Sequence, residues 1–323
     1  MKFSQIPLCA WPGALCIDAP SVALAWAWLL TRERGQALTP MIGCSLFLFV
    51  WLIYALDRFV QAFGVDAEED TVRHRFWFTY KYYLSVPVGL AISACVYFSL
   101  WVLPQNFIFG SGVLVVVLAI YLFFCCFTTR LSLNFKPKIW LCGLLFALGV
   151  QLASGYNLPA FQALSAQVDL EGRSGLLESI EAFWLMGIHG LLLLMRGNAL
   201  FLGVGFGINC AAISLWQQEK NPHLPDRRSF AGLGEKACIR FVRFTSFWIV
   251  VLIVFAVVGF RSAGGAEAMD SFETLHPWSL LSMASTLSLL LLFHFKRDRF
   301  SVETLRFIAD GVYLTPLVWV WVV

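Results

Sequence analysis

Long apolar segments separated by short polar connections run through the whole chain. Nine of them reach, or nearly reach, the roughly 20 residues that a helix needs to cross about 30 Å of hydrocarbon. They are too long and too evenly apolar for barrel strands, so each is predicted to be a transmembrane helix. The predicted spans are residues 14–31, 39–61, 82–102, 107–127, 138–154, 199–216, 244–260, 277–295 and 305–322.

One further apolar segment, residues 175–195, lies between the fifth and sixth predicted spans. If it crossed the bilayer, the cations that follow it would move to the opposite side. It is therefore predicted to be an amphipathic or re-entrant helix on the outer face, with Glu178, Glu181 and His189 toward water. The predicted fold class is an all-α integral membrane protein, with residues 1–323 forming a single transmembrane domain.

Composition and charge agree with this pattern and set an orientation. The chain is 59% hydrophobic and 13% charged, which leaves too little polar surface for a soluble domain of 323 residues. Threaded through a bilayer, the 23 Lys and Arg residues all fall on one side except Arg32, Arg34, Arg173, Arg196 and Arg261. The positive-inside rule then predicts a cytoplasmic N-terminus and an external C-terminus. A retained first helix is expected, because Pro12, Asp18 and Pro20 interrupt any signal-peptide pattern.

Familiar catalytic and metal motifs are missing from the sequence. It contains no P-loop, GxSxG or HExxH pattern. Its nine cysteines lie mostly in or beside the spans without CxxC spacing, so they are expected to pack as small side chains without metals or disulfides. No nucleic-acid partner is expected, and the oligomeric state is not predicted.

Ionisable and polar residues gather instead at the predicted cytoplasmic ends of two spans. Asp57 and Arg58 end the second span, where an ionisable group is costly unless it is paired or faces a wet cavity. Either an interfacial ion pair or a functional site explains Asp57. Arg73 and Arg75 flank a histidine just before the third span, where they could clamp a phosphate.

The sixth span carries the second group of polar residues. Asn209 lies about two helical turns inside it, where an interhelical hydrogen bond and a cavity-lining role explain it equally well. Gly203, Gly205 and Gly207 are expected to let a neighbouring helix approach closely. Glu219 and Lys220 follow at the cytoplasmic mouth.

Other polar residues in the last two spans receive simpler interpretations. Arg306 and Asp310 are one turn apart and are expected to form a local ion pair. His276 and His294 are expected at opposite ends of the eighth span, too far apart to share a metal.

Three stretches make the chain resemble the UbiA superfamily of intramembrane prenyltransferases. Ile53, Asp57 and Gln61 stand at the spacing of the family's NxxxDxxxD motif, and RHRFW follows as its basic loop. The stretch YLFFCCFTTRLSLNFKPKIWLCGLLFALGV is similar to the family's fourth and fifth helices, with Arg130 as the basic residue. NCAAISLWQQEKN stands in the place of the second acidic motif. The nine-helix layout, with cytoplasmic motif loops, is also the family's.

The resemblance implies transfer of an isoprenoid chain from a prenyl diphosphate to an aromatic or lipid-like acceptor, in a bacterial plasma membrane. Family enzymes hold Mg²⁺ ions against the diphosphate through two acidic motifs. Here the resemblance leaves Asp57 and Glu219 as the catalytic acids and magnesium ligands, since Ile53, Gln61 and Gln217 replace motif residues. Two carboxylates can hold one hydrated Mg²⁺ ion more readily than the two Mg²⁺ ions that are usual in the family. The implied diphosphate-binding residues are Arg58, Arg73, Arg75, Arg130 and Lys220, and the implied cavity residues are Tyr54, Asn209 and Trp216.

Two other function classes remain open at this point. A protein derived from that fold could bind an isoprenoid or another lipid without catalysing a reaction. It would keep the basic residues at the cytoplasmic end of the bundle although several carboxylates of the acidic motifs are missing. A transporter or a subunit of a membrane assembly is the other alternative, although a transporter would be expected to show inverted repeats and more polar residues at the membrane midplane.

Overall fold

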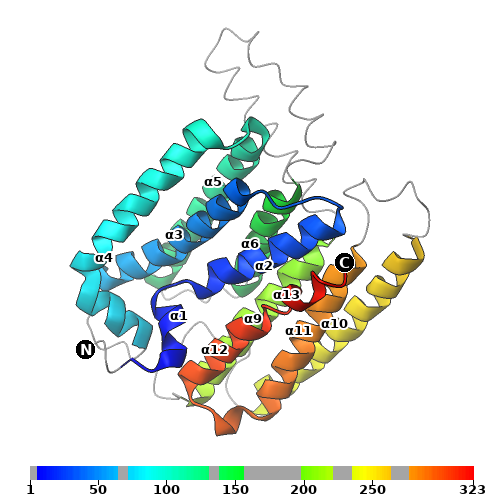
Figure 1. Ribbon diagram of the computed structural model, residues 1–323. Helices are drawn as coiled ribbons and strands as arrows, with labels where there is room; N and C mark the ends of the chain where they lie inside the picture. The colour runs from blue at the N-terminus through cyan, green and yellow to red at the C-terminus, as the bar shows by residue number, and fades with distance from the viewer. Residues whose placement is uncertain (1–5, 65–71, 131–137, 156–197, 221–234, 263–275) are drawn as a thin grey trace.

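The computed structural model describes residues 6–64, 72–130, 138–155, 198–220, 235–262 and 276–323 (Figure 1). All regular elements among these residues are helices, as predicted. The amphipathic helix predicted at residues 175–195 lies outside the described residues. The longer helices are α2 (Asp18–Glu33), α3 (Pro40–Gly64), α4 (Val72–Tyr97), α5 (Gln105–Arg130), α6 (Lys138–Gly155), α9 (Ala199–Lys220), α10 (Glu235–Ser262) and α11 (Pro277–Phe295).

Several of these helices have the length and composition of membrane spans. In the described part of the chain, five are long and apolar enough to cross a bilayer, or six if a bent pair at the N-terminus counts as one span. The five segments are Pro40–Phe59, Arg75–Val102, Ala199–Lys220, Lys236–Arg261 and Pro277–Phe295. Segments of α5 and α6 are apolar but shorter. A helical membrane protein is therefore supported, while nine spans and their orientation stay predictions.

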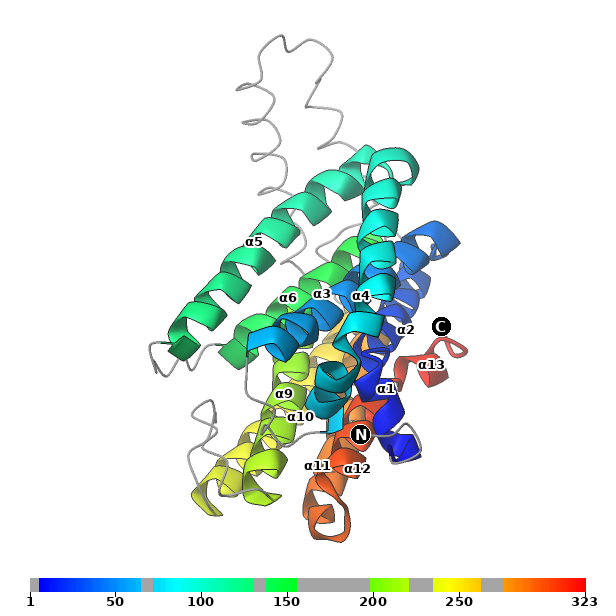
Figure 2. The same cartoon turned by 90° about the vertical axis from the view of Figure 1, so that its left-hand side faces the viewer.

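Burial separates central helices from peripheral ones. Helix α9 packs against α6, α10, α11 and α12 (Val302–Val312) and lies near the middle of the bundle in Figure 1. Helices α4 and α5 lie toward the outside in Figure 2. Tyr83 and Leu90 of α4 are 79% and 67% exposed, and Phe247 of α10 is 62% exposed. Large apolar side chains pointing outward along whole helices are typical of contact with lipid.

Glycine makes the closest helix packing possible, as the sequence predicted. A Cβ added at Gly143 of α6 would lie 2.4 Å from the carbonyl oxygen of Gly203 and 2.5 Å from the nitrogen of Gly207. On another face of α9, a Cβ at Gly205 would lie 2.3 Å from the sulfur of Met283. Small residues let helix backbones approach where a larger side chain would hold them apart.

The first predicted span is not straight. Helix α1 (Trp11–Ala14) and α2 meet at a break where the chain bends by 77°. Cys16 lies in this break with a φ of 57°, the left-handed region that non-glycine residues rarely adopt. The Trp77 indole donates to the carbonyl of Ala14 at 2.8 Å and fixes the end of α1. The bend places Asp18 at the first residue of α2.

The last predicted span, residues 305–322, is also divided. Helix α12 (Val302–Val312) ends before a turn, and α13 (Pro316–Trp319) follows. Pro316 has no N–H to donate to the carbonyl four residues earlier, so a regular helix cannot continue through it. The buried indole of Trp26 donates to the carbonyl of Tyr313, in the turn between the two helices, at 3.0 Å. This hydrogen bond links the division to α2.

Candidate functional site

Asp18 lies at the start of α2 with both carboxylate oxygens in polar contact. Its Oδ1 accepts a hydrogen bond from the backbone N–H of Ala19 at 2.9 Å. Its Oδ2 lies 3.8 Å from Nη1 of Arg73, which belongs to the first turn of α4. The Asp18 side chain is 11% exposed and that of Arg73 is 17% exposed. The bend before α2 therefore brings a mostly buried acid to a base from another helix.

Two further residues meet Asp18 from α12 and α9. The carboxyl group of Asp310 lies within side-chain hydrogen-bonding range of Asp18. Asn209 donates from Nδ2 to Oδ1 of Asp310 at 3.3 Å, so Asn209 does form an interhelical hydrogen bond. Its amide oxygen is buried and has no hydrogen-bond partner. Asp18, Asp310 and Asn209 are called the carboxyl site below.

Arginines from three helices surround the carboxyl site. Arg58 of α3 lies near Arg73 and near its own neighbour Asp57. Arg306 of α12 is 8% exposed and lies near Arg73, Arg58 and Asp310. These three residues, Arg58, Arg73 and Arg306, are called the arginine group. Like charges gathered away from water are costly unless acids or a bound anion offset them.

The ion pair expected between Arg306 and Asp310 is replaced by another. Nη1 of Arg306 lies 3.4 Å from Oε1 of Glu303, one turn earlier in α12. Nε of Arg306 is buried without a hydrogen-bond partner. Asp310 instead contacts Asn209 and Asp18, because α12 packs against α9 and α2.

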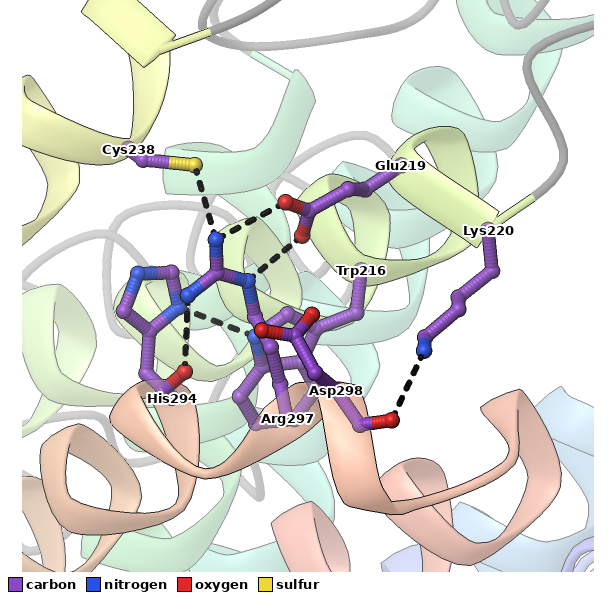
Figure 3. A network of polar contacts seen from close by, with 7 residues as sticks. All are labelled: Trp216, Glu219, Lys220, Cys238, His294, Arg297 and Asp298. Atoms are coloured by element: carbon purple, nitrogen blue, oxygen red, sulfur yellow. Dashed lines mark hydrogen bonds and ion pairs between the residues drawn. The ribbon is translucent and has the colours of Figure 1, made fainter.

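Glu219 belongs to a different network at the end of α9, shown in Figure 3. Arg297 donates from Nε to Oε2 at 2.6 Å and from Nη2 to Oε1 at 2.8 Å, so it binds both carboxylate oxygens. Its Nη1 also donates to the carbonyl of His294 at 3.0 Å. This bidentate pair raises the pKa of the Arg297 guanidinium.

The remaining neighbours of Glu219 also have structural partners. Trp216 is 1% exposed, and its indole donates to Nδ1 of His294 at 3.0 Å. Lys220 is exposed and donates to the carbonyl of Asp298 at 3.4 Å. These contacts fasten the end of α9 to the turn after α11, and they place Trp216 in the packed core.

The structure thus divides the residues that the sequence nominated into two groups. Asn209 is part of the carboxyl site and Arg73 contacts it. Tyr54 lies within range of the charges of Asp18 and Asp310, and Arg58, with its neighbour Asp57, lies within range of the charge of Arg73. Glu219, Lys220 and Trp216 belong to the Arg297 network, and Glu219 lies about 15 Å farther along α9 than Asn209. Arg75 is exposed. The side chain of Arg130 lies outside the described residues.

A third polar network joins the other ends of α2, α6, α9 and α11. Arg34 donates to Ser154 at 2.7 Å, to Gln151 at 2.5 Å and to Nε2 of His276 at 3.4 Å. Glu33 accepts from the backbone N–H of Ser279 at 3.0 Å. Burial, and then the charge of Arg34, lower the pKa of His276 to about 3. Burial lowers that of Arg34 to about 10, against the opposing effect of Glu33.

Asn198 completes this third network at the beginning of α9. Its Nδ2 donates to the carbonyl of His276 at 2.8 Å and to the hydroxyl of Ser279 at 2.5 Å. As the sequence predicted, His276 and His294 lie at opposite ends of α11. Every one of these contacts joins helix ends, so the network is explained by packing.

Sequence reasoning missed the role of Asp18 and the long-range partner of Asp310. The sequence held a signal for both residues, since Asp18 and Asp310 are acids that lie within predicted spans. Among the described residues, no three His, Cys, Asp or Glu side chains lie close enough to bind a metal. Comparison with protein-family models, with curated proteins and with solved structures found no match.

Proposed function

We propose that the protein is an intramembrane prenyltransferase similar to the UbiA superfamily, acting on a prenyl diphosphate. The observation that carries the proposal is that Arg58 of α3 and Arg73 of α4 lie close enough for their charges to interact, with Asp57 next to Arg58 in the chain. The sequence nominated both arginines for the diphosphate. Their place in a bundle of apolar helices suits a donor with an anionic headgroup and a hydrocarbon chain.

The arginines would bind the headgroup and assist its departure. Guanidinium groups bind phosphate oxygens through paired N–H donors and keep their charge in a poorly solvated site. As the allylic C–O bond breaks, the diphosphate leaves with the bonding electrons. Fixed positive charge beside it stabilises the transition state. The acceptor then forms the new bond to the allylic carbon and loses a proton.

The aromatic ring of Tyr54 is the candidate for contact with the prenyl chain near its reacting end. Tyr54 lies within range of the charges of Asp18 and Asp310 and is partly buried. An aromatic face stabilises a nearby positive charge, which an allylic cation carries. Trp216 cannot share this role without leaving the core, where its indole is bonded to His294.

The magnesium ligands implied by the resemblance do not fit together. Both oxygens of Glu219 are bound by Arg297, so a metal at Glu219 would have to displace that arginine. Glu219 is also about 15 Å along α9 from Asn209, which belongs to the carboxyl site. We therefore assign no metal-dependent step to Asp57 and Glu219 as a pair.

A non-catalytic protein that binds a phosphorylated lipid is the second candidate. The observation that favours it is the same engagement of Glu219, which removes one of the two expected catalytic acids. Such a protein would use Arg58 and Arg73 in the same way and would release its ligand unchanged.

Binding and turnover of a radiolabelled prenyl diphosphate by purified protein test both candidates. Arg58→Gln and Arg73→Gln are each expected to weaken binding at least tenfold, since each removes a charged headgroup contact. Arg240→Gln, which removes an exposed cation from α10, is the matched control and should bind normally.

The outcomes separate the two candidates. Transfer of label to an aromatic or lipid acceptor, lost in both site variants, supports the transferase. Binding without transfer to any acceptor tested supports the lipid-binding protein instead. Unchanged binding in Arg58→Gln and Arg73→Gln would overturn both.

A further inference from the structure

The geometry points to a divalent metal site formed by Asp18, Asp310 and Asn209, which suits a hydrated ion of the Mg²⁺ type. This inference rests on the proposed function only for the identity of the anion that joins the metal. The site differs from the pair Asp57 and Glu219 that the resemblance implies, and it draws on α2, α12 and α9.

The available ligand atoms are those that a hard cation prefers. Mg²⁺ binds oxygen, and in proteins it commonly uses one or two carboxylates while keeping several waters for itself or for substrate phosphates. Asp18 and Asp310 supply carboxyl groups in contact with each other. The Asn209 amide oxygen adds a buried acceptor without a partner. The Asn209 amide oxygen would be the third protein ligand of the ion, beside one carboxylate from Asp18 and one from Asp310.

The contact between the two carboxyl groups itself calls for a positive partner. Two ionised carboxylates at this range repel each other strongly where water is scarce. Arg73 approaches Asp18 only to 3.8 Å, and Asn209 is neutral. Either a shared proton or a shared cation removes the repulsion. The unpartnered oxygen of Asn209 favours the cation. If the amide turns so that this oxygen faces Asp310 in place of Nδ2, it can join the ligands, whereas a proton shared between the acids leaves it unsatisfied.

The charges around the site favour a metal that then accepts an anion. The arginine group faces the acids Asp18, Asp57, Glu303 and Asp310, which offset much of the positive charge that a diphosphate would meet. A bound divalent cation reverses that balance.

Arg306 has a free hydrogen-bond donor that could bind the anion. It is 8% exposed, and its buried Nε has no hydrogen-bond partner. A phosphate oxygen bound to the metal could accept from this N–H. The Asp18 and Arg73 side chains keep 11% and 17% of their surface exposed, so the site is not completely enclosed.

Direct titration of purified protein with Mn²⁺, followed by electron paramagnetic resonance without any prenyl diphosphate, tests the inference. Wild type is expected to bind one Mn²⁺ per chain, and excess Mg²⁺ should displace it. Asp18→Asn and Asp310→Asn should each weaken binding at least tenfold. Asp298→Asn removes an exposed acid after α11 and should bind as wild type.

Asn209→Asp provides a second test that does not depend on losing a ligand. A third carboxylate at this position should tighten severalfold the Mn²⁺ binding that wild type already shows, and excess Mg²⁺ should still displace the ion. Glu219→Gln should leave binding unchanged. Absence of Mn²⁺ binding by wild type, or wild-type binding in both Asp variants, would overturn the inference.

The results also separate this inference from the proposed function. Metal binding without prenyl transfer would leave the site standing and remove the transferase. Prenyl transfer that persists in EDTA, with no Mn²⁺ bound, would support the transferase and overturn the metal site.

Discussion

Arg297 binds Glu219 through both carboxylate oxygens, with its Nε 2.6 Å from Oε2 and its Nη2 2.8 Å from Oε1. The pair joins the last turn of α9 to the short turn after α11. A carboxylate held in this way has a structural explanation that requires no ligand.

Glu219→Gln is therefore expected to affect stability and leave headgroup binding intact. The substitution removes the charge from both hydrogen bonds, keeps one neutral acceptor and replaces the other with an amide NH₂. The Glu219 side chain is 35% exposed, so we expect a loss of only about 0.5–1 kcal/mol. The thermal midpoint in detergent measures the loss, with Asp298→Asn as the control. Loss of prenyl diphosphate binding would instead restore Glu219 to the functional site.

Gly143→Ala is expected to destabilise the bundle. The new methyl group would meet backbone atoms of Gly203 and Gly207, which cannot move aside as a flexible side chain can. Overpacking of this kind costs about 1–3 kcal/mol. Gly149→Ala on the same helix is the matched control, since its Cβ would lie 3.7 Å from a Leu114 methyl group. Equal thermal midpoints for the two variants would contradict the close packing of α6 on α9.

Stability is expected to fall in acid partly through His276. Its pKa is about 3 in the folded protein, against about 6.5 when exposed, so the unfolded chain binds a proton first as the pH falls. Titration of His276 therefore leaves the free energy of unfolding unchanged above about pH 6.5. Between about pH 6.5 and pH 3 it lowers that free energy by about 1.4 kcal/mol per pH unit at most.

Thermal midpoints measured from pH 7 to pH 5 check this expectation. His276→Gln keeps a polar side chain and the backbone contacts but cannot titrate. Its midpoint should change less over this interval than that of wild type. Parallel curves for the two proteins would show that His276 is not held neutral by its burial beside Arg34.

The predicted orientation can be checked with reporter fusions. Alkaline phosphatase fused after Val323 is expected to be active in a bacterial host, because the positive-inside rule predicts a C-terminus outside the cytoplasm. A fluorescent protein at the same position, which matures in the cytoplasm, should stay dark. The opposite pattern would reverse the orientation.

Helices could be predicted from the sequence, but their interruptions could not. The span predicted at residues 277–295 agrees with α11, since its apolar run has clear polar limits. The break before Asp18 depends on the backbone of Cys16 and on tertiary contacts such as Trp77 to Ala14. The turn after α12 had a local signal in Pro316, which the evenly apolar pattern of the last segment obscured.

The candidate site, too, could be predicted from the sequence only in part. Asp57, Arg58, Arg73 and Asn209 could be nominated because polar groups in apolar segments are costly and therefore informative. The partnership of Asp18 with Asp310 could not, since it joins the first and last parts of the chain through packing alone. Glu219 was assigned from motif spacing, which carries no information about Arg297.

Helix α9 carries a member of each polar network, with Asn198 just before it, Asn209 along it and Glu219 at its end. Its 22 residues form a rod about 33 Å long, whose glycines are locked against two neighbours. A rod fixed at both ends and in the middle can neither slide nor turn alone. Any movement that admits a ligand must therefore come from the helices around it.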